Sequence, residues 1–156
     1  MKNPRIFLLL AFVWLSPQLL SAQSPETTYD STLAKSLGAD AYGMKMYVFV
    51  ILKTGPNQIA DPVLRDSLFA GHFANMSHMA EAGKLVVAGP MEKNDQQYRG
   101  IFILDVPDFA TAETLLQNDP TIKEKVLVPE MYHWYGSAAL PLYLDDHKKI
   151  QAEKIE

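Results

Sequence analysis

Alternation of apolar and polar segments along the chain predicts four strands and two helices. Strands are expected where β-branched and aromatic residues form short runs between turn residues. These runs are residues 46–52, 85–89, 100–106 and 128–135. Helices are expected where apolar residues recur with a period of about 3.6 residues. These segments are residues 62–82 and 108–119. The order β-α-β-β-α-β follows, with one more helical turn expected within residues 121–127.

Cap residues set the expected bounds of the helices. Asp61 suits the N-cap of the first helix, Pro62 its first position and Gly83 its C-terminal stop. Asp119-Pro120 is interpreted as the stop of the second helix, because the residue before a proline disfavours the helical conformation. The apolar face of the first helix is expected to comprise Leu68, Phe69, Met76, Met79 and Ala80.

This order predicts an α+β, ferredoxin-like fold, a four-stranded antiparallel sheet with two helices on one face. Residues 46–52 are apolar on both faces and are expected to form a central strand. Pro129 marks either the start of the last strand or an edge position. The second sheet face also needs a cover, and the pattern offers no further layer within one chain. We therefore expect a homodimer through the sheet face.

The N-terminus has the three parts of an export signal. Lys2 and Arg5 precede an apolar run, which Ser16-Pro17 interrupts before the small residue Ala22. The uninterrupted run is shorter than the ~20 residues that a membrane span needs. We predict a cleaved signal peptide at residues 1–22, export to the periplasm or the outside, and no membrane attachment after cleavage.

The rest of the chain divides into three parts. Residues 23–43 are a polar, flexible lead-in in which Leu33 and Leu37 have a weak helical spacing. Residues 44–136 form the folded domain, and residues 137–156 form a polar tail with a short helix.

Composition narrows the chemistry. The chain of 156 residues contains no cysteine, which excludes a thiolate nucleophile, a cysteine zinc site and an iron–sulfur cluster. Its net charge is −4, and loss of residues 1–22 would make it −6. This charge gives no electrostatic reason to expect a nucleic-acid partner. Phosphate-binding glycine loops and the G-x-S-x-G elbow are absent from the sequence.

Histidines are the best remaining candidates for chemistry. His72 lies in the middle of the apolar helix face, where loss of hydration favours the neutral, proton-accepting form. The alternative is a core histidine bonded to a backbone carbonyl. His78 lies on another helix face, toward solvent, so the two do not suggest a metal site. His147 lies in the tail, and no sequence pattern around it indicates a function. We expect neither a metal nor a cofactor.

Two further groups extend the candidate site. Asp119 is either only part of a helix stop or a carboxylate that orients His72 across the two helices. His133 and Trp134 belong to an aromatic stretch of the last strand. They are candidates for binding a flat organic ligand, with ordinary core packing as the alternative.

The stretch from Gly71 to Pro90 resembles the YCII-related (YciI-like) family. That family has a helix with one histidine, a glycine eleven residues later and a strand ending in Ala-Gly-Pro. Asp119-Pro120 and Trp134 match two further marks, and the resemblance covers about residues 45–136. It implies a dimeric α+β barrel and a functional pair formed by His72 and Asp119. Some relatives act as dehydrochlorinases on chlorinated aromatic breakdown products.

Two functions follow from these patterns. The first is an exported, cofactor-independent lyase or isomerase, in which His72 acts as acid or base on a small organic substrate and Asp119 orients it. The alternative is a non-catalytic ligand-binding or accessory homodimer, in which the two side chains only satisfy each other. An open cleft holding both would favour catalysis, and a sealed pair would favour the alternative.

Overall fold

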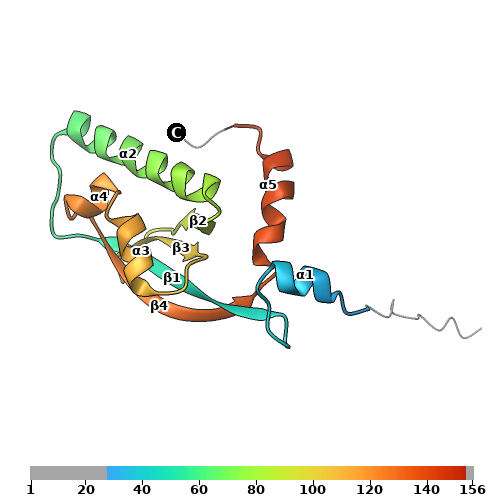
Figure 1. Ribbon diagram of the computed structural model, residues 1–156. Helices are drawn as coiled ribbons and strands as arrows, with labels where there is room; N and C mark the ends of the chain where they lie inside the picture. The colour runs from blue at the N-terminus through green and yellow to red at the C-terminus, as the bar shows by residue number, and fades with distance from the viewer. Residues whose placement is uncertain (1–27, 154–156) are drawn as a thin grey trace, which may run out of the picture.

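The computed structural model describes residues 28–153, so the predicted signal peptide lies outside the described residues. The strands are β1 (Met44–Thr54), β2 (Leu85–Pro90), β3 (Tyr98–Leu104) and β4 (Leu127–Ser137). The helices are α1 (Ser31–Ser36), α2 (Pro62–Glu81), α3 (Phe109–Leu116), α4 (Pro120–Lys123), the 3-10 helix η1 (Leu140–Tyr143) and α5 (Leu144–Ile150). All strand pairs are antiparallel, in the order β2-β3-β1-β4, with α2 and α3 on one face (Figure 1). The ferredoxin-like α+β fold is thus confirmed for the protomer.

Helix α2 begins and ends where its cap residues predict. The Asp61 side chain accepts a hydrogen bond from the Val63 N–H at 2.9 Å, and Pro62 occupies the first turn. Gly83 follows the helix with a φ of +68°, a left-handed conformation that glycine adopts without steric cost. The predicted and observed ends differ by a single residue.

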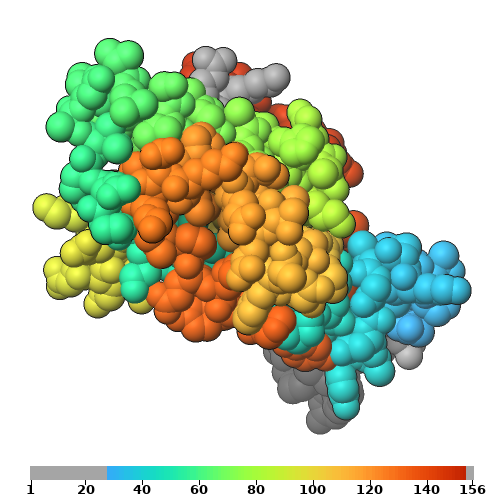
Figure 2. Space-filling view, turned by 60° about the vertical axis from the view of Figure 1, so that its left-hand side comes forward, coloured from blue at the N-terminus to red at the C-terminus, as the bar shows by residue number. Residues whose placement is uncertain are grey.

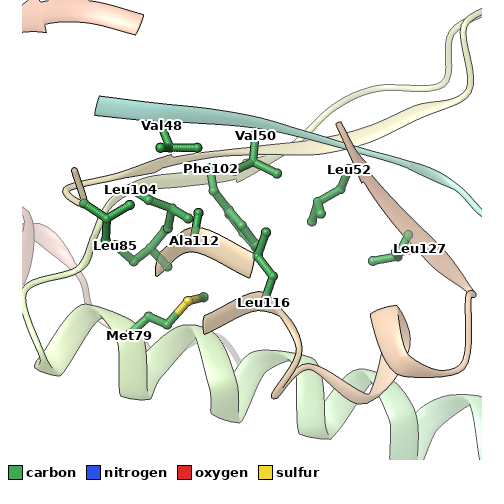
Figure 3. Close-up of a cluster of buried hydrophobic side chains, with 11 residues drawn as sticks. Val48, Val50, Leu52, Met79, Leu85, Phe102, Leu104, Ala112, Leu116 and Leu127 are labelled. Carbon is green, nitrogen blue, oxygen red and sulfur yellow. The ribbon is translucent and has the colours of Figure 1, made fainter. Parts of the chain in front are cut away.

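The main core lies between the sheet and helices α2 and α3. Alternate residues of β1 point toward the helices, because successive side chains of a strand face opposite ways. They pack with apolar residues of the other three strands and of both helices (Figure 3). The cluster includes Val48, Val50, Leu52, Met79, Leu85, Phe102, Leu104, Ala112, Leu116 and Leu127. The central position of β1, predicted from its apolar character on both faces, is confirmed.

The buried face of α2 differs from the predicted one. Ala80 is exposed, whereas Asn75 is buried together with His72 and Met79. The Asn75 amide donates a hydrogen bond to the backbone carbonyl of Leu115 at the end of α3. The helix is therefore rotated slightly toward α3, and a polar residue that apolar periodicity passes over occupies part of the core face.

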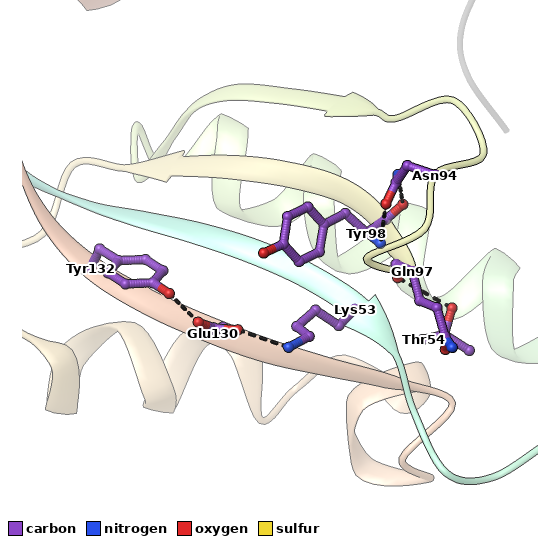
Figure 4. A network of polar contacts seen from close by, with 7 residues as sticks. All are labelled: Lys53, Thr54, Asn94, Gln97, Tyr98, Glu130 and Tyr132. Carbon is purple, nitrogen blue, oxygen red and sulfur yellow. Dashed lines mark hydrogen bonds and ion pairs between the residues drawn. The ribbon is translucent and has the colours of Figure 1, made fainter.

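Strand β3 begins two residues before its predicted start. The Asn94 side chain accepts a hydrogen bond from the Tyr98 N–H at 3.0 Å and donates one to the Tyr98 carbonyl (Figure 4). These bonds close the turn between β2 and β3 early, so that Tyr98 and Arg99 belong to the strand. Strand β4 lies at the sheet edge, as the Pro129 position allows.

The second face of the sheet is partly covered by the chain itself. Leu140 of η1 packs against the buried cluster of Tyr47, Val86 and Ile103. The Tyr143 hydroxyl donates a hydrogen bond to the Val86 carbonyl at 2.6 Å. The expectation that one chain offers no cover for this face was wrong, because apolar residues of the tail supply part of it. Among residues 28–153 no helix is both long and apolar enough to cross a membrane.

Candidate functional site

The two side chains proposed to carry chemistry are in contact. Nδ1 of His72, in the middle of α2, lies 2.5 Å from Oδ2 of Asp119. Asp119 is the N-cap of α4, and its side chain is fully buried. His72 keeps 7% of its surface exposed. Sequence spacing could not establish this contact, because its two residues lie 47 positions apart on different helices.

Thr121 holds the carboxylate from the other side. Oδ1 of Asp119 accepts hydrogen bonds from the Thr121 backbone N–H at 2.9 Å and from its hydroxyl at 2.7 Å. Both oxygens of the buried carboxylate are thereby satisfied, and Thr121 is itself fully buried. Asp119-Pro120 starts a helix here, as Asp61-Pro62 does, so its interpretation as a simple helix stop was incomplete.

The protonation state of Asp119 follows from its surroundings. Burial alone would raise the pKa of Asp119, because it disfavours the charged form. Hydrogen bonds from His72 and Thr121 outweigh burial and hold the pKa of Asp119 below its usual value. The carboxylate is thus ionised at neutral pH and can only accept hydrogen bonds. Nδ1 of His72 must then donate, so Nε2 is the ring nitrogen left to exchange a proton with a substrate.

A close approach of α2 and α4 brings the pair together. Gly71 precedes His72 and faces the ring of Pro120, which follows Asp119; a Cβ at position 71 would overlap that ring. The absence of a side chain at Gly71 therefore lets the two helices approach. The same approach sets the distance between the imidazole and the carboxylate.

Replacing Gly71 with alanine is expected to destabilise the protein. The added methyl overlaps the rigid Pro120 ring, and overpacking of this kind costs about 1–3 kcal/mol. Alanine's helix propensity offsets only about 1 kcal/mol of that cost. Urea unfolding measures the change, with Ser77→Ala on the exposed side of α2 as the control. A Gly71→Ala protein more stable than the wild type would contradict the close approach.

His72 borders an apolar cavity of about 330 Å³ on the helix side of the sheet. Its ring centroid lies 5.5 Å from that of Phe73 and 5.9 Å from that of Phe102. The lining comes from α2, from the ends of β1 and β2, from the first half of β3 and from the start of β4: Leu52, Phe69, His72, Phe73, Met76, Ala88, Gly89, Pro90, Arg99, Gly100, Phe102 and Leu127. The cavity holds both an acid–base group and flat apolar walls.

His133 and Trp134 lie away from this cavity. The His133 ring stacks on Phe109 of α3, with centroids 4.2 Å apart, on the helix side of the sheet. Trp134 lies on the opposite face beside Tyr47, with ring centroids 5.7 Å apart. Neighbouring residues of a strand point to opposite faces, so these two cannot line one pocket within a chain. The structure brings neither of them to His72.

Several residues at the site were not identified from the sequence. Thr121 could have been found from its place two residues after a helix-capping aspartate, a common hydrogen-bonding pattern. Phe73 and Arg99 carry no local signal, because their place in the cavity depends on packing between distant segments. Within the described part of the chain no group of three or more His, Asp or Glu side chains is arranged to hold a metal ion.

Comparison with known proteins places the chain in a family. A model of the YCII-related domain matches residues 46–132. A solved structure of 5-chloro-2-hydroxyhydroquinone dehydrochlorinase from Burkholderia phenoliruptrix, in complex with 2,5-dihydroxybenzoquinone, is 19% identical. The similarity covers 56% of this chain and 92% of that one, with a TM-score of 0.40. No curated protein sequence matches the chain. The family match spans more than half of the sequence, and the chain therefore belongs to the YCII-related domain family.

Proposed function

We propose that this protein is an enzyme of lyase or isomerase type that uses His72 as a general acid–base and needs no cofactor. The observation that carries the proposal is the contrast between the two partners. Asp119 is sealed from solvent, whereas His72 borders a cavity of about 330 Å³. A pair that serves only the core would have no reason to present its imidazole to open space.

The proposed mechanism uses the two ring nitrogens differently. Nδ1 donates to Asp119, which fixes the ring orientation and leaves Nε2 to take a proton from a substrate in the cavity. When Nε2 accepts the proton, the ionised carboxylate stabilises the resulting imidazolium. The same nitrogen then returns the proton at another atom or to a leaving group. Elimination and isomerisation both need such a transfer.

The proposed substrate is a small organic molecule with a flat or cyclic body. Phe69, Phe73 and Phe102 surround the His72 ring, and apolar lining of this kind suits a planar apolar ligand. The neighbouring dehydrochlorinase structure contains a quinone. Its similarity is too low to transfer that substrate, so the substrate class rests on the cavity alone.

A second candidate function is a ligand-binding or accessory protein without turnover. The small exposure of His72 favours it, because a pair that is nearly closed can serve packing alone. The two functions differ in what happens to a bound molecule. A binding protein releases it unchanged, whereas an acid–base enzyme converts it.

A ligand screen followed by turnover measurements tests the proposal. The full chain is screened by thermal shift against a metabolite library, and each stabilising compound is incubated with the protein and followed by mass spectrometry or NMR. We expect at least one cyclic or aromatic ligand to be converted into an isomer or an elimination product. Ligands that all stabilise the protein and all remain unchanged would favour the accessory function.

Assembly and location remain part of the proposal. A homodimer through the sheet face is supported by three exposed apolar residues that share this face of β4 with Glu130: Val128, Tyr132 and Trp134. Cover by the tail at Tyr143 leaves this edge of the face open. Sedimentation velocity measures the mass, and a monomer at micromolar concentration would contradict the dimer.

Export is proposed from residues 1–22 alone.

A further inference from the structure

A second hollow of about 250 Å³ adjoins the His72 cavity. Phe69, Arg99 and Leu127 line both spaces. The second hollow is formed by the end of β1, the β1–α2 connection, α2, and the starts of β3 and β4: Thr54, Asn57, Gln58, Ile59, Arg65, Phe69, Arg99, Val126 and Leu127. In the space-filling view the green connection lies near the yellow β2–β3 hairpin and orange α4 at one end of the molecule (Figure 2).

The two adjoining spaces hold positive charge without a balancing acid. Arg65 and Arg99 both line the second hollow, and no Asp or Glu among the described residues lines either space. Arg65 lies 3.7 Å from its exposed neighbour Asp66, a weak surface pair. Arg99 forms no ion pair with any residue in the range 28–153. In a chain of net charge −4, two arginines at one hollow without an acidic residue in its wall point to an anionic ligand.

A β-bulge in β3 directs Arg99 toward the two spaces that it lines. Leu52 pairs with Gly100 and Lys53 with Tyr98, so the register skips Arg99. Regular alternation would send the Arg99 side chain to the face of Ile101, away from the helices. The extra residue re-aims the side chain, and bulges are frequent beside binding sites for this reason. Arg99 consequently borders the cavity that contains His72.

Hydrogen bonds fix the part of the second hollow that is formed by the end of β1 and the β1–α2 connection. The Thr54 N–H donates to the Gln97 carbonyl at 3.0 Å, and the Gly55 N–H donates to the Val126 carbonyl at 2.8 Å. The Thr54 hydroxyl also reaches the Gln97 carbonyl (Figure 4). The Asn57 amide donates to the Glu124 carbonyl at 2.6 Å. The end of β1 and the β1–α2 connection are thus held against the residues that directly precede β3 and β4, and the hollow is a built feature of the fold.

We propose that Arg99, assisted by Arg65, binds a carboxylate of the substrate while the apolar body of that substrate lies beside His72. A guanidinium matches the two oxygens of a carboxylate with two parallel hydrogen bonds. Within residues 28–153, Arg99 is the single arginine or lysine lining the His72 cavity, which suits one monoanionic group. The inference rests on the proposed function and assigns its substrate class: a small cyclic or aromatic organic acid.

Binding of a matched acid and alcohol tests this assignment. The full-length protein is titrated calorimetrically with benzoate, benzyl alcohol and phenyl phosphate at one ionic strength. We expect benzoate to bind about 10-fold or more tightly than the alcohol, because a charge-assisted bidentate contact is lost with the neutral group. Arg99→Gln should remove this difference, Arg99→Lys should keep part of it, and Arg65→Gln should reduce it less.

The control variant is Lys93→Gln, which removes an exposed cation of the same hairpin that lines neither space. It should leave the preference for benzoate unchanged. Equal affinity for acid and alcohol, undetectable binding of benzoate, or an Arg99→Gln protein that keeps the preference would overturn the proposal. Tighter, Arg65-dependent binding of phenyl phosphate would assign the site to phosphate esters and overturn the carboxylate.

The same titrations separate this inference from the proposed function. Binding requires no turnover, so the titration with benzoate is repeated on His72→Gln. A charge preference that persists in that variant supports the anion site whether or not His72 is catalytic. Loss of turnover in His72→Gln without any preference for acids would support the acid–base role and overturn the anion site.

Discussion

Replacement of His72 by glutamine is expected to lower kcat/KM by about 10²–10⁴ while the protein remains folded. Glutamine keeps a polar group that can donate a hydrogen bond to the buried Asp119, but it has no nitrogen that can accept a proton from the substrate. Loss of rate without loss of structure is therefore the mark of the acid–base role. Turnover of the best substrate from the ligand screen measures the rate, and circular dichroism checks the fold.

His78→Gln provides the matched control on the same helix. His78 is exposed and lines neither of the two spaces beside α2, so its replacement should leave kcat/KM unchanged. Turnover that survives in His72→Gln at the wild-type rate would refute the acid–base role. His72→Leu tests the accessory function, under which ligand affinity is kept although the variant leaves Oδ2 of the buried Asp119 without its donor and lowers the free energy of unfolding.

Much of the fold could be predicted because its signals are local. The run that forms β1, the cap at Asp61 and the stop at Gly83 each depend on residues within one element. Those local signals agree with the overall fold, and a fold can be predicted from its sequence when local preferences and tertiary structure agree. The buried face of α2 was harder to predict. Asn75 is buried there because its amide donates a hydrogen bond to a carbonyl of α3, a contact between two elements that local sequence does not indicate.

The site was only partly predictable because its geometry arises between elements. Family resemblance pointed to His72 and Asp119. Their contact, however, requires a close approach of α2 and α4, which is possible because Gly71 has no side chain to overlap the Pro120 ring. Arg99 lines the cavity because of a β-bulge in β3, and no local sequence pattern predicts that bulge. His133 and Trp134 lie next to each other in the chain, yet the pleat of β4 sends them to opposite faces.

Asp119 makes a second strong prediction, which concerns stability. Asp119→Ala should lower the free energy of unfolding by about 3 kcal/mol at pH 7, because it strands buried donors of His72 and Thr121 and removes the cap of α4. Urea unfolding measures the loss. Asp108→Ala is the matched control, since it removes the cap of α3 at an exposed site and strands no buried side chain. Its loss should be clearly smaller.

The stabilising effect of Asp119 should also depend on pH. Its folded pKa lies below the unfolded value of 3.8, so the ionised form favours the folded state. This contribution is fully present above pH 3.8 and is lost as the pH falls through the lower folded pKa. The difference between wild type and Asp119→Ala should therefore narrow in acid. A difference that is constant from pH 7 to pH 3 would mean that folding does not lower the pKa of Asp119. A difference that widens in acid would mean that the carboxyl is protonated in the folded protein, and Nδ1 of His72 would then have no anion to orient it.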